Sequence, residues 1–194
     1  MPELPEVETI RLGLQRYIVG KTIEDVEVRL PKIISGDTKN IIGGKVVDVK
    51  RFGKGLVIDL DNGYSLAIHI KLTGQLIYRG SEVSKVSNVS KGKIGGELPN
   101  KFTHVIFKLK SPHFAPLSGA SRGKQNSKDG NGKNAYLYYN DLRQFGWIKI
   151  VKTDEVKNLP FFKDLGPEFL NNLTMKQFNN IVSSSSSSIK PLLM

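Results

Sequence analysis

The sequence predicts a mainly β fold: an antiparallel β-sandwich of about eight strands, with an N-terminal helix before it and a truncated α-helical region after it. Three observations support this class. Apolar and polar residues alternate in eight short stretches, no helical pattern separates those stretches, and helical spacing returns only after Val151. With 194 residues and 39% hydrophobic content, the chain is long enough to bury a sizeable core.

The first residues of the chain predict a helix. Val7, Ile10 and Leu14 recur at the spacing of one helical face. Pro5 suits the first turn, where its missing N–H costs nothing, and Gly20 is a plausible end. The opening residues MPELPEVE therefore lie at the start of this helix.

Strands are expected wherever apolar and polar residues alternate. Asp61-Asn62-Gly63 is a hairpin turn that separates two of these strands. The eight expected strands lie within residues 21–30, 44–53, 55–60, 64–70, 74–80, 103–110, 135–141 and 145–151.

Two segments, 82–101 and 111–134, lack periodicity and are rich in Gly, Ser, Asn and Pro. They predict long loops between strands. A second, helical region is expected from Thr153, with Thr174 and Gln177 at the spacing of a capping box. We therefore divide the chain into a sandwich domain, 1–152, and a helical region, 153–194.

The charge of the chain indicates a polyanionic partner. Its 29 Lys and Arg against 18 Asp and Glu give a net charge of +11 and a pI near 9.7, a balance typical of nucleic-acid-binding proteins. Residues 79–133 hold eleven Lys or Arg and three Asp or Glu, a surplus of eight. Because these residues are also rich in Ser, Gly and Asn, a merely solvated loop explains this local surplus equally well.

Other classes of protein are not expected. No apolar run reaches the length of a membrane span, and the N-terminus lacks the basic and apolar stretches of a signal peptide. The absence of cysteine excludes disulfides and thiolate metal sites, and the three scattered histidines do not suggest a zinc cluster. We expect a cytoplasmic protein without a metal in this chain.

Five motifs in a fixed order carry a family resemblance. They are MPELPEVE at the N-terminus, RFGK at 51–54, HIKLTG at 69–74, DLRQFG at 141–146 and LGPE at 165–168. Together they resemble the formamidopyrimidine-DNA glycosylase family, which removes oxidised purines from DNA. The resemblance covers most of the chain apart from the two loops, and five ordered motifs are far more specific than any single one.

The resemblance assigns the catalytic chemistry to the N-terminus. If Met1 is removed, the secondary amine of Pro2 can attack C1′ of a deoxyribose, displace the damaged base and form a Schiff base. An α-amino group has a pKa of about 7.7 to 8.0, so part of it is neutral near pH 7. Glu3 is implied as the general acid and base, and Glu6 as a second carboxylate in the lesion pocket. The alternative is that these acids merely stabilise the N-terminus of a helix. The catalytic and the stabilising role are compatible with each other.

The resemblance also assigns DNA contacts. Lys54 corresponds to a lysine that holds a phosphate and approaches the lesion, where it takes part in catalysis, and His69 falls on a phosphate-contacting position. Each of these residues alone would be an ordinary surface residue.

A base must leave the duplex before Pro2 can reach its sugar. The resemblance implies that Leu72, Arg143 and Phe145 fill the resulting gap, with Leu72 standing where the family usually has Met. The alternatives are that Leu72 is a core leucine at a strand end and that Phe145 is a core aromatic residue.

The implied activity is that of a bifunctional DNA glycosylase and abasic-site lyase, which excises 8-oxoguanine and formamidopyrimidines in base excision repair. The expected partner is damaged double-stranded DNA, bound by a monomer. The family's zinc finger, with its zinc, would lie beyond Met194, so no cofactor is expected here, and we expect the chain to be a fragment of reduced activity. Two alternatives stay open: a non-catalytic or degenerate DNA-binding module, and an oxidised-pyrimidine glycosylase of the endonuclease VIII type.

Overall fold

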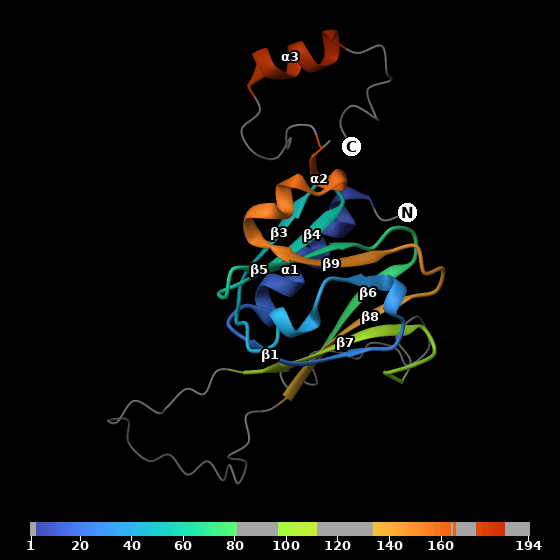
Figure 1. The fold of residues 1–194 in the computed structure, drawn as a ribbon. Helices are drawn as coiled ribbons and strands as arrows, with labels where there is room; N and C mark the ends of the chain where they lie inside the picture. Colours follow the sequence, from blue (N-terminus) through green and yellow to red (C-terminus); the bar gives the residue numbers. More distant parts are fainter. Residues whose placement is uncertain (1–2, 81–96, 112–133, 164, 166–173, 185–194) are drawn as a thin grey trace, which may run out of the picture.

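The computed structural model describes residues 3–80, 97–111, 134–163, 165 and 174–184. The described strands form two sheets that pack face to face, as Figure 1 shows. The prediction of a mainly antiparallel β-sandwich with an N-terminal helix is confirmed. Most of the two expected loops, 81–96 and 112–133, lies outside the described residues.

One sheet has four strands in the order β1-β7-β8-β6, and all of its pairs are antiparallel. Its strands are β1 (Thr22–Val28), β6 (Gly74–Arg79), β7 (Thr103–Lys110) and β8 (Asn134–Asp141).

The other sheet has five strands in the order β2-β9-β5-β4-β3. Its strands are β2 (Ile34–Ser35), β3 (Val46–Phe52), β4 (Gly55–Leu60), β5 (Tyr64–His69) and β9 (Trp147–Lys152). The eight expected strands are confirmed. Strand β2, which pairs in parallel with β9 over two residues, was not expected from the residue pattern.

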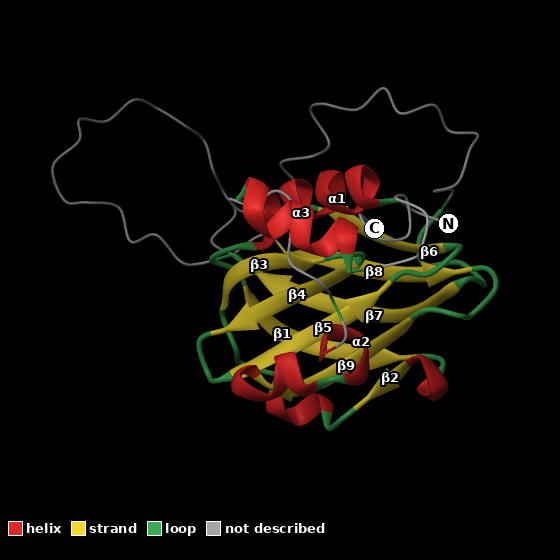
Figure 2. Cartoon of the chain, turned by 90° about the horizontal axis from the view of Figure 1, so that it is seen from above, coloured by secondary structure: helices red, strands yellow, loops and turns green. Residues whose placement is uncertain are grey.

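Helix α1 (Leu4–Ile18) contacts β3 and β6, the edge strands of the two sheets, and therefore closes one side of the sandwich. Val7, Leu14 and Ile18 form its buried face, as the spacing predicts. Figure 2 shows strands of the sandwich between α1 and α2.

The first two elements after β9 cover the outer face of the five-stranded sheet. They are the 3₁₀ helix η3 (Thr153–Asn158) and helix α2 (Pro160–Lys163). Val156 and Phe162 pack there on Val57 and Ala67, which point away from the main core. The division of the chain at residue 152 stays a prediction.

Three short elements complete the described structure: the 3₁₀ helices η1 (Pro31–Ile33) and η2 (Thr38–Asn40), and helix α3 (Met175–Ser183). Helix α3 begins with the expected capping box between Thr174 and Gln177. None of its residues is buried.

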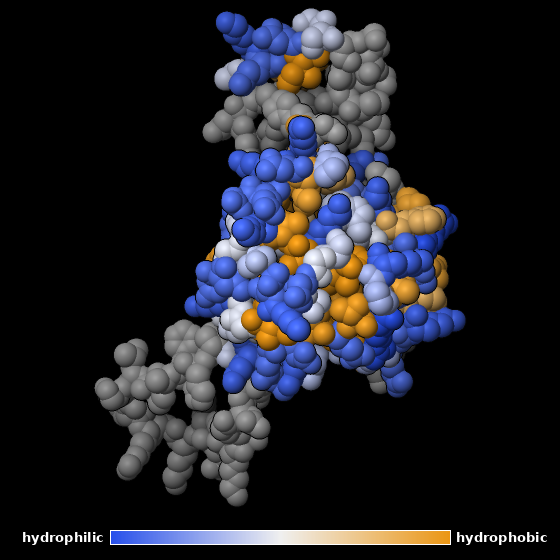
Figure 3. All heavy atoms as spheres, viewed as in Figure 1, coloured by the Kyte–Doolittle hydropathy of each residue, from blue (hydrophilic) through white to orange (hydrophobic). Residues whose placement is uncertain are grey.

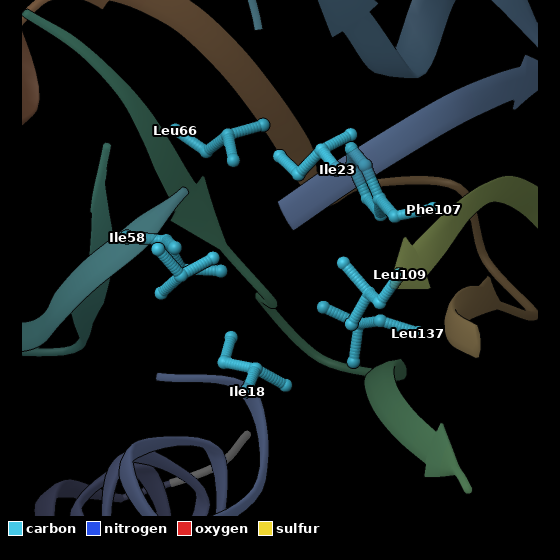
Figure 4. Close-up of a pocket in the computed structure, with 8 residues that line it drawn as sticks. Ile18, Ile23, Ile58, Leu66, Phe107, Leu109 and Leu137 are labelled. Atoms are coloured by element: carbon cyan, nitrogen blue, oxygen red, sulfur yellow. The ribbon is translucent and has the colours of Figure 1, made fainter. Parts of the chain in front are cut away.

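The main core lies between the two sheets and holds a small apolar cavity of about 10 Å³. Figure 4 shows side chains from both sheets and from the end of α1 directed into this space. Because no polar group lines the cavity, it offers a water molecule no hydrogen bonds and is expected to be dry. Its lining residues are Ile18, Ile23, Val46, Ile58, Leu66, Phe107, Leu109 and Leu137.

Candidate active site and nucleic-acid interface

The first turn of α1 holds the two candidate carboxylates. Glu3 is the N-cap, and it forms a reciprocal capping box with Glu6. The Glu3 N–H donates to the Glu6 carboxylate at 2.7 Å, while the Glu3 side chain accepts from the backbone N–H of Glu6. Both residues are exposed. The predicted nucleophile, Pro2, lies outside the described residues.

Arg51 connects α1 to the turn that carries Lys54. Its Nε donates to Glu8 of α1 at 2.8 Å, and its Nη1 donates to the Gly53 carbonyl at 3.0 Å. Gly53 and Lys54 form the two-residue turn between β3 and β4, and Lys54 is half-buried there. The start of α1 and Lys54 therefore lie at the same end of the sandwich.

His69 ends β5 at this same end, opposite Gly55 of β4 and Trp147 of β9. Only 4% of it is exposed, so its description as an ordinary surface residue is wrong. The physical reason is aromatic cover from residues far along the chain: the ring of His69 meets Phe161 edge to face, with the centroids 4.4 Å apart.

The electrostatics of His69 keep its ring neutral. Burial, followed by the positive charges of Lys71 and Lys54, lowers the pKa of His69 to about 4. Its Nδ1 accepts the Lys71 N–H at 3.0 Å, which leaves the proton on Nε2. Such a ring can offer a phosphate a hydrogen bond but no positive charge.

Leu72 lies in the loop between β5 and β6. The Gly74 N–H donates to the Ile70 carbonyl at 2.9 Å and closes this loop, and Lys71 within it has a φ of +50°. The side chain of Leu72 is 39% exposed. The alternative of a core leucine is therefore wrong.

Arg143 and Phe145 lie in the loop between β8 and β9. Phe145 is 59% exposed, which excludes the alternative of a core aromatic residue. Leu142 is equally exposed and was not predicted, although an apolar residue beside Arg143 in a short loop is a visible signal. Exposed apolar side chains beside basic ones are typical of a surface that contacts another molecule.

The two loops lie side by side, as Figure 1 shows for the links between β5 and β6 and between β8 and β9. The Arg143 N–H donates to the Thr73 hydroxyl at 3.0 Å, which joins the loops directly. Figure 3 shows hydrophobic atoms at the edge of the molecule where these loops lie.

Asp141 and Arg51 organise this end of the sandwich, although the residue patterns assign them no role. Asp141 begins the DLRQFG motif, and its buried carboxylate accepts hydrogen bonds from both loops. An acid that ends a strand and precedes a loop is a weak signal for such a role.

The structure thus gathers Glu3, Glu6, Lys54, His69, Leu72, Arg143 and Phe145 at one end of the sandwich. Acid, base and apolar side chains lie there beside the start of a helix, whose positive end favours anions and an unprotonated amine. Among the described residues, no cluster of His, Cys, Asp and Glu could hold a metal ion, and no helix is long and apolar enough to cross a membrane.

Comparison with known proteins gives one consistent family. The family model of the formamidopyrimidine-DNA glycosylase N-terminal domain matches residues 1–148. The chain is 37% identical over 200 residues to the formamidopyrimidine-DNA glycosylase of Pelotomaculum thermopropionicum, and the match covers 100% of this chain and 59% of that protein. The enzyme of the same name from Heliobacterium modesticaldum is 32% identical over 200 residues, with 100% of this chain and 60% of that protein covered.

Solved structures show the same fold. The chain is similar to the Lactococcus lactis formamidopyrimidine-DNA glycosylase bound to DNA that contains an abasic site, with a TM-score of 0.67 and 24% identity. This similarity covers 99% of the present chain and 62% of that one. A complex of the same enzyme with DNA that contains formamidopyrimidine-dG also has a TM-score of 0.67 and 24% identity, and the match covers 98% of this chain and 60% of that one. The chain spans about 60% of the length of the curated relatives described above.

Proposed function

The chain belongs to the formamidopyrimidine-DNA glycosylase family, and on that premise we propose that it is a bifunctional DNA glycosylase and abasic-site lyase of base excision repair. Its substrates are oxidised purines, 8-oxoguanine and formamidopyrimidines, in double-stranded DNA, and it acts as a monomer in the cytoplasm. The observation that carries the proposal is the convergence of α1, the Lys54 turn and the two exposed loops at one end of the sandwich, within the residues that match the family.

The covalent steps proposed for Pro2 use only groups of the chain and the substrate, and water then hydrolyses the final iminium to free the amine. The lone pair of its free amine attacks C1′ of the damaged nucleotide, and the C1′–N bond breaks as the base leaves with a proton from an acid. Ring opening gives an iminium between the Pro2 nitrogen and C1′. The iminium acidifies the C2′ protons, so that loss of one proton to a base expels the 3′ phosphate and cuts the strand.

Glu3 is the residue we propose for these proton transfers, because it directly follows the nucleophile in the chain. The capping box with Glu6 fixes its backbone position, and the residue is exposed at the start of α1. Glu6 lies one turn further along and lines the lesion pocket in this proposal. Lys54 holds a phosphate near the lesion, on a turn that Arg51 ties to α1.

Reaching the sugar requires the damaged nucleotide to leave the stack, at a cost of a few kcal/mol. We propose that Leu72, Phe145 and Arg143 supply part of this energy by occupying the vacated space. Their exposure supports this role, since neither apolar side chain contributes much to the core of the free protein.

Borohydride reduction in the presence of abasic-site DNA tests the proposal. We expect a covalent protein–DNA band, and mass spectrometry should place the adduct on residue 2. Acetylation of the N-terminus or retention of Met1 should abolish the band, because neither leaves the Pro2 nitrogen with a free lone pair. Pro5→Ala is the matched control, since Pro5 lies in the same helix start but its nitrogen is in a peptide bond.

An adduct that maps to a lysine, or that survives acetylation, would overturn the assignment of Pro2. Binding to abasic DNA without any adduct would support the non-catalytic module instead. Single-turnover excision from duplexes that contain 8-oxoguanine or thymine glycol then separates the purine from the pyrimidine specificity, and we expect the faster rate on 8-oxoguanine.

A further inference from the structure

We propose that Asp141 is a positioning residue that couples the Leu72 loop and the Phe145 loop into one rigid wedge, an inference that rests on the function proposed above. Asp141 is 1% exposed, and its carboxylate lies between the two loops. One oxygen, Oδ1, accepts from the Thr73 hydroxyl and from the Arg143 N–H at 3.1 Å. The other, Oδ2, accepts from the Gly146 N–H at 2.8 Å. A single buried group therefore holds both loops.

The rest of Asp141 is fixed to the four-stranded sheet. It ends β8 and pairs with Gly74 at the start of β6. Its backbone N–H donates to the Phe102 carbonyl at 3.0 Å, and its own carbonyl accepts from His104 Nε2 at 2.7 Å. The carboxylate thus projects from a rigid element, whereas the loops it holds contain residues in the left-handed region, Lys71 and Gln144.

The chemistry of the contact requires a carboxylate. Asp141 accepts on both oxygens, and hydrogen bonds to an ionised acceptor are stronger than those between neutral groups. An amide in its place could accept on one oxygen only and would turn an N–H group toward either Gly146 or the Thr73 and Arg143 pair. Asp141→Asn therefore keeps the shape of the site but loses at least one of the hydrogen bonds that hold the loops.

The Thr73 hydroxyl is the second half of the connection. It donates to Asp141 and accepts from the Arg143 N–H at 3.0 Å, so both of its functions are used between the loops. Thr73→Val has nearly the same shape but no hydroxyl, while Thr73→Ser keeps the hydroxyl. A comparison of these two variants separates the contribution of the hydrogen bonds from that of side-chain packing.

Coupling has a functional consequence because the two apolar side chains must enter one gap together. Side chains and loops that are ordered only on binding reduce the affinity by the cost of ordering them. Loops held in place before binding avoid that cost. Loss of the connection should therefore weaken binding to opened DNA more than binding to intact duplex.

The test uses the full chain and two duplexes, one with a tetrahydrofuran abasic analogue opposite 2-aminopurine and one intact. The wild-type chain should prefer the abasic duplex and change the 2-aminopurine fluorescence. We expect Thr73→Val and Asp141→Asn to lower this preference by about tenfold, equivalent to about 1.4 kcal/mol, while Thr73→Ser stays within about twofold of the wild type. In the free protein, amide exchange at Arg143 and Gly146 should quicken in the first two variants only.

Faster amide exchange in these variants without any loss of the preference for the abasic duplex would show that Asp141 only stabilises the fold, and would overturn the inference. If Thr73→Val does not fold, Asp141→Asn is compared with Thr73→Ser in the same binding assay. Borohydride trapping of the wild type on abasic DNA tests the proposed function separately. If the wild type forms an adduct and the variants keep its preference for the abasic duplex, only the coupling of the two loops by Asp141 is refuted. A wild type without adduct or preference refutes the proposed function, and the inference with it.

Discussion

Arg51 lies almost fully buried between α1 and the β3–β4 turn, and its Nε donates to the carboxylate of Glu8 at 2.8 Å. Only 5% of the Arg51 side chain is exposed, compared with 24% for Arg11, which binds the same carboxylate from one helical turn away. The hydrogen bond from Arg11, opposed by burial and aided by Arg51, lowers the pKa of Glu8. Glu8 therefore stays ionised at neutral pH and joins the start of α1 to the turn that carries Lys54.

We expect Arg51→Gln to lower the free energy of unfolding by about 2 kcal/mol, because it leaves the Glu8 carboxylate without its buried partner. Chemical denaturation measures this change. Arg11→Gln is the matched control and should cost less than about 1 kcal/mol, since Arg11 is more exposed and its ion pair lies within one helix. Equal losses in the two variants would contradict the view that burial makes Arg51 the important partner.

The same pair of variants tests the connection to catalysis. If Arg51 aligns the start of α1 with Lys54, Arg51→Gln should slow borohydride trapping on abasic DNA under conditions where the variant is folded. Arg11→Gln should trap at the rate of the wild type. A normal trapping rate in Arg51→Gln would limit Arg51 to a stabilising role.

Gly146 lies against the hydroxyl of Tyr139, and this contact permits no side chain. A Cβ at Gly146 would lie 1.8 Å from Tyr139 Oη and 2.8 Å from the His69 carbonyl oxygen. We expect Gly146→Ala to reduce stability by about 3 kcal/mol through overpacking. Tyr139→Phe should recover part of this loss, because it removes the nearest atom. Thermal unfolding of the single and double variants measures the coupling.

Two further measurements make this test specific. Tyr139→Phe alone should cost less stability than Gly146→Ala, because the buried Tyr139 hydroxyl makes no hydrogen bond of ordinary geometry within the described residues, although burial and the nearby Asp141 carboxylate raise its pKa. Gly55→Ala is the control for the rescue: its Cβ would lie 2.5 Å from Phe162 Cε1, and its nearest neighbours are rings of Phe161 and Phe162, so removal of the Tyr139 hydroxyl should not restore stability. Equal rescue of both alanine variants would refute the contact as the cause.

The sequence predicts the strands well because alternation is a local property, and all eight expected strands are present. The alternation of apolar and polar residues does not predict structure that depends on distant residues. Strand β2 has two residues and pairs with β9, more than a hundred positions later. Both faces of β5 are buried, one in the main core and one under η3 and α2, so alternation gives no sign of the cover over His69.

The candidate site also combines residues that local motifs identify with contacts that these motifs do not reveal. The ordered motifs name Lys54, Leu72, Arg143 and Phe145, and the structure places these residues at one end of the sandwich. They do not reveal that Thr73 and Asp141, 68 positions apart, hold two of these motifs together. A hydrogen bond between distant loops follows from the register of β6 with β8, which residue patterns along one strand cannot define.

His69 should make the protein acid-sensitive. Its pKa in the folded state is about 4, compared with a reference value of 6.5. Between these values the unfolded state binds a proton that the folded state does not, so stability falls as the pH decreases from 6.5 toward 4. Above pH 6.5 both states are neutral, and His69 contributes no pH dependence.

We expect His69→Gln to reduce the slope of unfolding free energy against pH by up to about 1.4 kcal/mol per pH unit in this window. Denaturation at several pH values measures the slope. His104→Gln is a suitable comparison, because His104 is also buried but lies on β7, away from Lys54 and Lys71. An unchanged slope in His69→Gln would mean that another group controls the acid sensitivity.

The last prediction separates the two kinds of DNA contact at this end of the sandwich. Lys54 offers a positive charge that any phosphate can satisfy, whereas Phe145 is 59% exposed and offers apolar surface that only an opened duplex can accommodate. We expect Lys54→Gln to weaken binding to intact and abasic duplexes alike and to reduce the slope of log K against log salt by about 1. Phe145→Ala should leave the salt slope unchanged and weaken binding to the abasic duplex alone, with stability changed by less than about 0.5 kcal/mol. Titrations of both duplexes at three or more salt concentrations measure all of these quantities. If Phe145→Ala weakens binding to both duplexes equally, Phe145 contacts the outside of the duplex, and only Leu72 and Arg143 remain as candidates to fill the gap.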